Sequence, residues 1–308
     1  MKIRIGFGLG TRSVTNEAAS FGTMVEDLER LGFDSLWLSE RISGETLDPL
    51  VGMTYAAART TRIKFGMSVM VLPGRNPVVL AKELASLDRL SDGRLLPAFG
   101  LGVADKHEQS AFGVRREDRA PMFNEALPLL RRLWSEEEVT HHGDHYHLDA
   151  VTVRPKPTQQ PLDVWLGGIA PSELKRVGRL GDGWLPSFCT PDDVERSRPI
   201  IEEAGAMHGR AMDEEHWGAL IAYTEGEVPD IVAAAIAARR PDLADPTAVI
   251  ASGHDGLRTR IEQFIGVGTS KFVAIPLSEP ADWDAELESV ASAVLDLQCG
   301  PVPTNSLQ

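Results

Sequence analysis

Four cationic side chains stand directly after four separate apolar runs of the chain. They are Arg12, Arg41, Arg75 and Lys106. The chain as a whole is acidic, since 45 Asp and Glu outnumber 31 Lys and Arg and give a formal net charge of -14. A single arginine in such a loop is usually solvated or caps a helix, but several cations near one another attract an anion. We therefore predict a phosphorylated, anionic cofactor near these loops, with Arg12, Arg41 and Arg75 as anion-binding residues.

Two glycine pairs follow apolar runs in the same way. Gly100-Leu101-Gly102 comes after one run and Gly167-Gly168 after another. Such pairs are common in turns, but glycine also lets the backbone approach a ligand closely. The free N–H groups of a helix that begins after Gly168 would favour an anion. The first pair lacks the third glycine and the first-unit position of a dinucleotide fingerprint, so a Rossmann site is not indicated.

The loops that carry these residues lie between short apolar runs, which alternate with amphipathic helices. The eight runs begin near, or span, Ile3, Phe33, Ile63, Leu95, Val164–Leu166, Gly183–Leu185, Ala219–Ala222 and Lys271–Ile275. The first four are spaced about 30 residues apart, the length of one βα unit. Near-continuous apolar runs are typical of a parallel sheet that is covered on both faces. Eight βα units predict an α/β fold, a (β/α)8 TIM barrel with its site at the strand ends; a doubly wound open sheet is the alternative.

Capping residues mark several helix ends. The apolar periodicity from Phe21 to Leu31 predicts a helix that stops at Gly32, and Asp48-Pro49 and Asn76-Pro77 each predict a helix start. Further helices are predicted over residues 121–134, 172–180, 192–208, 228–239, 256–266 and 282–297. Pro97 lies inside the fourth run, so either the strand starts after it or a bulge is present.

One stretch breaks the alternation. Residues 139–161 contain four of the eight histidines, at positions 141, 142, 145 and 147. We interpret this stretch as an insertion before strand five, within a single barrel domain that spans residues 1–308. The spacing of the histidines lacks the geometry of a known metal site, so we predict an exposed loop and no metal.

The composition excludes several classes of protein. Hydrophobic residues make up 43% of the chain and charged residues 25%, which is typical of a globular protein. No basic stripe indicates nucleic-acid binding, and no apolar run is long enough to cross a membrane. Two cysteines, Cys189 and Cys299, are too few for a disulfide framework. Without a recognisable signal peptide at Met1–Gly6, we expect a cytoplasmic protein that acts on a small molecule.

Several motifs in the same order resemble the luciferase-like monooxygenase superfamily. They are Leu31 to Leu38 (LGFDSLWL), Ser68 to Pro73 leading to Asn76-Pro77, Leu87 to Leu95 (LDRLSDGRL), Ala111-Phe112-Gly113, Val164 to Gly168 (VWLGG) and Gly181 to Trp184 (GDGW). The resemblance covers roughly residues 1 to 190 and is looser beyond them. The run WLSERI at residues 37–42 is most similar to the actinobacterial type of F420-dependent oxidoreductase.

The resemblance implies a luciferase-like barrel that binds FMN or the deazaflavin coenzyme F420. It places the following residues at the cofactor: Ser39, Glu40, Ser68, Val69, Val71, Leu101, Gly102, Lys106, Gly167, Gly168, Ala170 and Pro171. By the same resemblance, Ser39 and Glu40 would lie beside the ring, and the residues from Gly167 onward would lie at the phosphate. A non-proline cis peptide bond is expected at Ser68–Val69.

The sequence departs from the family pattern at the ring. Sugar-phosphate dehydrogenases of the superfamily have an Asp-His pair where this chain has Ser39-Glu40, and an acidic residue where it has Val103. Because the His base is absent, sugar-phosphate oxidation is not expected. Glu40 is the candidate catalytic acid or base if burial raises its pKa, and an ion pair with Arg41 is the alternative role.

We therefore expect an F420-dependent oxidoreductase that transfers a hydride between F420 and an unidentified small organic substrate. An FMNH2-dependent monooxygenase that uses molecular oxygen is the first alternative, and a non-catalytic cofactor-binding barrel is the second. Similar proteins often form homodimers, which makes a second copy of the chain a candidate partner.

Overall fold

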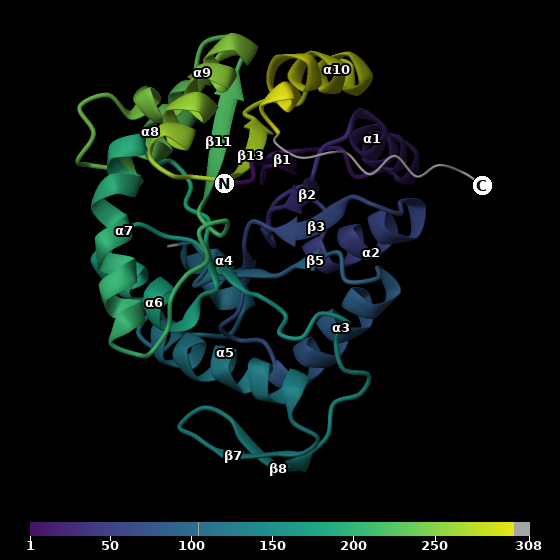
Figure 1. Cartoon of the computed structure of the whole chain (residues 1–308), viewed down its shortest axis with the longest axis vertical. Coiled ribbons are helices and arrows are strands. Elements are labelled where there is room, and N and C mark those ends of the chain that lie inside the picture. Colours follow the sequence, from purple (N-terminus) through teal and green to yellow (C-terminus); the bar gives the residue numbers. More distant parts are fainter. Residues whose placement is uncertain (104, 299–308) are drawn as a thin grey trace.

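The computed structural model describes residues 1–103 and 105–298, and its strands occupy the positions of a barrel (Figure 1). The barrel strands are β1 (Arg4–Leu9), β2 (Ser35–Leu38), β3 (Lys64–Met67) continued by β4 (Met70–Val71), β5 (Leu95–Leu96) continued by β6 (Ala98–Gly100), β9 (Trp165–Leu166), β10 (Gly183–Trp184), β11 (Gly218–Thr224) and β13 (Lys271–Pro276). Each apolar run predicted from the sequence contains one of these strand positions. Nearly all strand residues are buried, which explains why the runs lack polar alternation.

The strands close into a ring. Hydrogen bonds give the order β12-β11-β13-β1-β2-β3-β5 in one sheet and β10-β9-β6-β4 in the other, where β12 (Ala251–Ser252) is a short strand beside β11. β4 continues β3, and β6 continues β5. The third and fourth strands of the barrel therefore belong to both sheets. Parallel bridges from Trp184 to Trp217 and from Ser187 to Leu220 connect β10 with β11. Within the described residues this is an eight-stranded parallel barrel, which confirms the TIM-barrel prediction against the open sheet.

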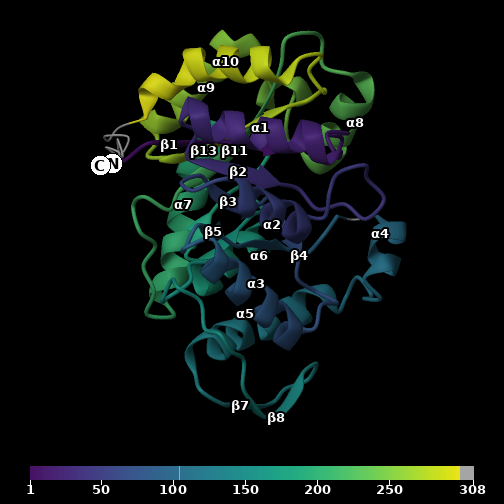
Figure 2. The ribbon, with the colours of Figure 1, turned by 90° about the vertical axis from the view of Figure 1, so that its right-hand side faces the viewer.

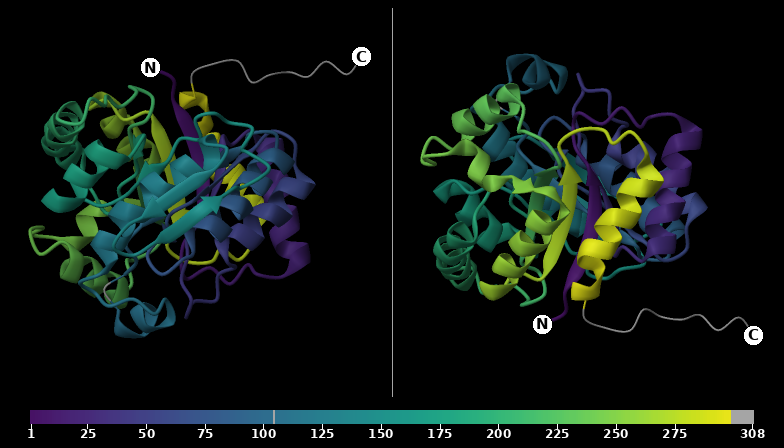
Figure 3. Two further views of the ribbon diagram at one scale, coloured as in Figure 1. Left: turned by 90° about the horizontal axis from the view of Figure 1, so that it is seen from below. Right: turned by 90° about the horizontal axis from the view of Figure 1, so that it is seen from above.

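Helices surround the strands (Figure 3). They are α1 (Ala18–Leu31), α2 (Pro49–Arg59), α3 (Pro77–Leu90), α4 (Lys106–Ala111), α5 (Arg119–Ser135), α6 (Pro171–Leu180), α7 (Pro191–Ala206), α8 (Asp230–Arg239), α9 (Gly253–Gly266) and α10 (Trp283–Val294), with short 3-10 turns at Pro246–Val249 and Leu295–Leu297. Near the end of the described chain, α10 packs beside α1 and so closes the helical layer as well. None of the helices described in residues 1–298 is long and apolar enough to cross a membrane.

The predicted capping residues stand at the observed helix ends. Asp48 accepts a hydrogen bond from the N–H of Val51 at 3.0 Å, and Asn76 accepts one from the N–H of Val78 at 2.9 Å. Gly32 ends α1 with φ of 95°, the left-handed conformation that glycine adopts without steric cost. These local interactions fix where the helices begin and end, and therefore how far each strand end lies from the next helix.

Pro97 interrupts the fourth strand without ending it. β5 before the proline pairs with β3, and β6 after it pairs with β4 and β9. The carbonyl of Pro97 still accepts a hydrogen bond from the N–H of Trp165 at 2.8 Å. The strand thus loses only the hydrogen bond that proline cannot donate.

The first part of the stretch at 139–161, predicted as an exposed loop, forms an antiparallel hairpin of β7 (Val139–His142) and β8 (His147–Val151), which projects from the bottom of Figures 1 and 2. Glu125 of α5 anchors it by accepting hydrogen bonds from the N–H groups of His145 and Tyr146 at 3.0 and 2.9 Å. The same carboxylate contacts the ring of His141. Of the two cysteines, Cys189 is a buried free thiol, and Cys299 lies outside the described residues.

Candidate active site

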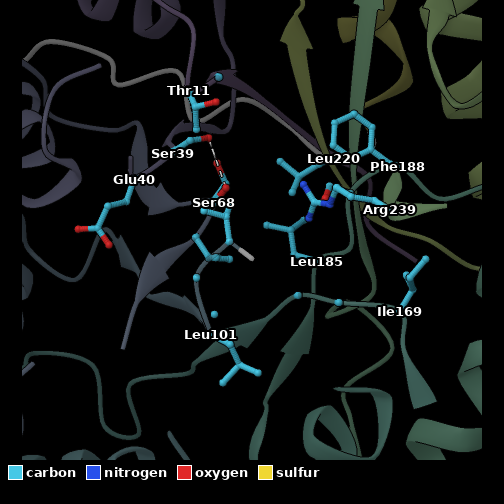
Figure 4. A pocket seen from close by; sticks show the side chains of 18 of the residues that line it. Thr11, Ser39, Glu40, Ser68, Leu101, Ile169, Leu185, Phe188, Leu220 and Arg239 are labelled. Atoms are coloured by element: carbon cyan, nitrogen blue, oxygen red, sulfur yellow. Dashed lines mark hydrogen bonds between the residues drawn. The ribbon is translucent and has the colours of Figure 1, made fainter. Parts of the chain in front are cut away.

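A cavity of about 1220 Å³ opens at the carboxyl ends of the barrel strands. Every strand position contributes to its wall, through Leu9, Ser39, Val71, Gly100, Leu166, Leu185, Leu220 and Ile275. Figure 4 shows several of the lining side chains approaching one space from different sides. Ligand pockets usually measure roughly 300 to 1,000 Å³, so this cavity has room for a cofactor and a small substrate together.

Two serines form a polar part of the wall (Figure 4). The hydroxyl of Ser39, after β2, lies 3.2 Å from the hydroxyl of Ser68 and 3.3 Å from the Ser68 carbonyl oxygen. The Ser68–Val69 peptide bond is cis, as the family resemblance predicted. Ser39, Ser68 and Val69 therefore reach the cavity from adjacent strands, as expected from the sequence.

Glu40 is held on both carboxylate oxygens. One oxygen accepts the N–H of Val71 at 2.7 Å, and the other contacts the Arg75 guanidinium. Only 2% of the Glu40 side chain is exposed. Burial raises the pKa of Glu40, while Arg75 and the Val71 N–H act in the opposite direction. The pairing partner is thus Arg75, and the alternative of a pair between Glu40 and Arg41 is not what the structure shows.

The contacts of Arg75 argue against the prediction that it binds an external anion. Besides Glu40, its guanidinium donates to the Val71 carbonyl at 2.8 Å and lies over the Phe112 ring. Arg75 is not among the described residues that line the cavity. Its positive charge is therefore compensated within the protein by Glu40.

The loop after β6 is fixed by an arginine that the sequence analysis missed. A single nitrogen of Arg119, at the start of α5, donates to the carbonyls of Leu101, Gly102 and Val103 at 3.1 to 3.2 Å. Gly102 has φ of 81°, and a Cβ atom there would lie 3.2 Å from Val71. Arg119 Nε is buried without a partner in the described part of the chain. Arg119 therefore holds the closely packed backbone of this loop at the cavity wall.

The loop after β9 places Gly167, Gly168, Ala170 and Pro171 on the cavity wall, as predicted. The N–H groups of Ile169 and Ala170, expected to be free for a phosphate, instead donate to Glu173 at 3.1 Å each. Glu173 is the third residue of α6 and caps the helix. A glutamate three residues into a helix is a known capping signal, so this contact was visible in the sequence.

The remaining predicted cations have different surroundings. Arg12 lines the cavity and is exposed, whereas Arg41 also lines it but lies 3.6 Å from the buried carboxylate of Glu108. Lys106 is exposed at the start of α4 and does not line the cavity, which argues against its predicted cofactor contact. Of the four cations that follow the first four strands, two therefore reach the cavity.

One cluster on the cavity wall has no counterpart in the sequence analysis. Arg176, Arg196, Arg239 and Arg240 come from α6, α7 and the end of α8, and all line the cavity. None of the motifs in the sequence singles them out, and three of the four lie beyond residue 190. Only the closed barrel brings these helices to the same opening as the serine wall.

Comparisons with known proteins agree with this architecture. The family model of the luciferase-like monooxygenases matches residues 2–240. The chain is 34% identical over 194 residues to an F420-dependent glucose-6-phosphate dehydrogenase of Kineococcus radiotolerans, which covers 59% of this chain and 57% of the relative. It is 32% identical over 202 residues to limonene 1,2-monooxygenase of Rhodococcus erythropolis, which covers 63% of this chain and 52% of the relative. The chain thus spans a little over half the length of these curated relatives.

Solved structures share the fold at lower identity. An F420-dependent secondary alcohol dehydrogenase in complex with an F420-acetone adduct superposes with a TM-score of 0.78 at 22% identity, covering 97% of this chain and all of the other. An FMN complex of the oxygenating constituent of 3,6-diketocamphane monooxygenase from Pseudomonas putida gives 0.72 at 17% identity, covering 98% of this chain and all of the other. With the family model matched over most of its length, the chain belongs to the luciferase-like monooxygenase family.

Proposed function

We propose that this chain is an F420-dependent oxidoreductase that transfers a hydride between F420 and a small organic substrate. The observation that carries the proposal is the cavity of about 1220 Å³, to which all eight strand positions contribute a wall residue. Apolar side chains of the later strands face the Ser39 and Ser68 hydroxyls across this space. Such an arrangement suits a flat ring with a substrate above it.

The residues around the cavity fit a cofactor that has a flat ring and a phosphate. Gly100 leaves room beside Val69, because a Cβ atom at Gly100 would lie 2.5 Å from that side chain. Arg119, whose buried Nε has no partner among the described residues, and the exposed Arg12 both line the same space and would favour a negatively charged group there. When bound, F420 would supply two-electron hydride chemistry at its ring.

The protein's own groups would bind and orient the cofactor and the substrate and shield them from water. We place the ring against the wall that Ser39 and Ser68 form, where their hydroxyls would be polar groups beside it. Glu40 acts through Val71 and Arg75, whose positions it fixes, so we assign it a positioning role rather than a proton-transfer role. With cofactor and substrate bound, the barrel strands and the loops after them would shield the reacting atoms from water.

The second candidate is a monooxygenase that uses FMNH2 and molecular oxygen. It is favoured by the names of two similar proteins, limonene 1,2-monooxygenase and the FMN-bound camphane enzyme. Both cofactors carry a tricyclic ring and a phosphate, so the contacts described above would serve that shared part of either. F420 also carries an acidic glutamate tail, which Arg12 and Arg41 on the cavity wall would attract.

Direct titration distinguishes the candidates. Purified protein is mixed separately with F420 and with FMN, and the quenching of cofactor fluorescence is measured. We expect micromolar binding of F420 and much weaker binding of FMN. Tight FMN binding without F420 binding, together with oxygen consumption in the presence of a flavin reductase, would establish the monooxygenase instead. F420 binding without turnover of any substrate would support the non-catalytic barrel.

A further inference from the structure

Three of the four arginines that α6, α7 and α8 bring to the cavity have fixed partners. Arg240, with a side chain only 4% exposed, donates to Asp193 at 2.9 Å and to Asp242 at 2.6 Å. Arg196 pairs with the other oxygen of Asp193 at 2.6 Å. Arg176 donates to the side chain of Asn124 at 3.1 Å and lies over the Phe123 ring. The charges of Arg240 and Arg196 are therefore neutralised by carboxylates at bonding distance.

Arg239 differs from its neighbours. Its side chain forms no ion pair or hydrogen bond with any residue that the structure describes, and its guanidinium lies over the Phe188 ring at 5.4 Å. In Figure 4 its side chain points into the cavity, toward the part where Leu185 and Leu220 line the wall. Surrounding protein lowers the pKa of Arg239 and Glu173 raises it, but a guanidinium keeps its proton at any ordinary pH.

The platform beneath Arg239 is held in place by the paired arginine next to it. Phe188 has φ of 52°, a left-handed conformation that a bulky residue rarely adopts. Its carbonyl oxygen accepts a hydrogen bond from Arg240 at 2.6 Å, and Arg240 is in turn fixed by Asp193. The aromatic ring is thus positioned by buried contacts, and the ring orients the unpaired guanidinium above it. Such an orientation limits the side-chain entropy that ligand binding would cost.

We propose that Arg239 binds the carboxylate of an acidic organic substrate, whose apolar part lies against Leu185 and Leu220. A guanidinium matches a carboxylate with two parallel hydrogen bonds. Arg239 is exposed, so a carboxylate that enters the cavity can reach it. The cofactor phosphate is a second source of negative charge, and Glu173, which caps the predicted phosphate loop after β9, acts on the charge of Arg239. We assign Arg239 to the substrate because Leu185 and Leu220 belong to the two strand positions after β9, and the test below separates the two roles. The inference rests on the proposed function only in placing the redox reaction in this cavity.

The test compares acids with neutral molecules of the same shape. Two pairs serve as probes: mandelate with 1-phenylethane-1,2-diol, and lactate with propane-1,2-diol. Their affinities are measured by calorimetry on the purified full chain, with and without F420. We expect the better-fitting acid to bind at least about tenfold more tightly than its diol, as an added charged hydrogen bond requires. In Arg239→Gln this preference should disappear with diol binding unchanged, and Arg239→Lys should keep part of it.

Arg89→Gln is the matched control, because Arg89 is an exposed arginine of α3 outside the cavity and its loss changes the net charge equally. It should bind all probes as the parent chain does. The inference is overturned if no acid binds better than its diol, or if Arg239→Gln keeps the preference. If Arg239→Gln weakens binding of F420 but not of the deazaflavin chromophore that lacks phosphate and glutamates, Arg239 serves the cofactor instead. Failure of the proposed function is a separate result, namely that neither F420 nor this chromophore binds.

Discussion

The carboxylate of Glu40 shows how a side chain's neighbour in sequence can differ from its partner in space. Arg41 is adjacent in the chain, but both residues lie in the loop after β2, where neighbouring side chains can point in different directions. Glu40 instead reaches Arg75, which follows the next strand of the barrel, while Arg41 lies near Glu108. The pair joins the ends of two neighbouring strands at the edge of the cavity.

Replacing Arg75 by glutamine should destabilise the protein through Glu40. The change leaves a buried carboxylate with one hydrogen bond, from Val71. Because Arg75 is itself 23% exposed, we expect a loss of about 2 kcal/mol in the free energy of unfolding, below the usual cost of breaking a fully buried pair. Urea denaturation at neutral pH measures the loss.

The pH dependence of the free energy of unfolding tests whether Glu40 causes the loss of stability in Arg75→Gln. Burial raises the pKa of this carboxyl in the folded state, and without Arg75 the pKa should rise further. A raised carboxyl pKa favours the protonated folded protein, so the destabilisation of Arg75→Gln should grow as the pH rises through the acid range to neutrality. The double variant Glu40→Gln/Arg75→Gln lacks the titrating group and should not show this growth. Equal pH profiles for the two variants would assign the loss to packing.

At the scale of elements, the loop from β9 to α6 combines a conformational and a steric requirement. Gly168 has φ of 96°, and a Cβ atom there would lie 2.5 Å from the Glu173 carboxylate oxygen. That carboxylate holds the first N–H groups of α6. Any side chain at Gly168 must therefore both strain the backbone and displace the helix cap.

Gly168→Ala should accordingly weaken cofactor binding as well as stability. The matched control is Gly32→Ala, because Gly32 has φ of 95° but a Cβ atom there would meet no described residue beyond its chain neighbours within 4 Å. Both variants should lose about 1 to 2 kcal/mol from the left-handed backbone. Only Gly168→Ala should also reduce F420 affinity. We expect a loss of about tenfold, which is the effect of losing one charged hydrogen bond between the loop and the cofactor. Fluorescence titration measures the affinity, and equal F420 binding by the two variants would show that the Glu173 cap does not shape the cofactor site.

The elements were largely predictable because their signals are local. Apolar runs, Asp48, Asn76 and Gly32 act within a few residues, so the sequence alone located strands and helix ends. The residues at the strand ends of the first half were also predictable, because parallel strands bring their carboxyl ends to one opening. Arg75 and Arg239 were misjudged or missed because their roles depend on which residue of another element lies beside them. A local sequence pattern does not indicate which residues of different elements lie close together in the fold.

At the scale of the whole molecule, closure of the barrel brings its last strand beside its first. Register pairs Arg4 of β1 with Lys271 of β13 at the end opposite the cavity. Asp34, just before β2, lies 2.8 Å from the Lys271 amine and 3.3 Å from the Arg4 guanidinium. The side chains of Asp34 and Lys271 are only 10% and 6% exposed. One carboxylate therefore links the first, second and last strands.

Asp34→Asn should weaken this closure in a pH-dependent way. Burial acts to raise the pKa of Asp34, but Lys271, Lys64 and Arg4 outweigh it and hold the pKa below its ordinary value. A depressed carboxyl pKa stabilises the fold at pH values above about 3.9, and this contribution is lost as the pH falls through the folded-state pKa. We expect Asp34→Asn to cost about 2 to 4 kcal/mol in the free energy of unfolding at pH 7, since Lys271 stays buried without its partner. Asp284→Asn removes an ion pair of an aspartate that is 62% exposed and should cost much less. Denaturant unfolding of both variants and the parent chain at a series of pH values measures these losses. If the difference in the free energy of unfolding between Asp34→Asn and the parent chain stays constant into the acid range, then shape, rather than charge, holds the first and last strands together.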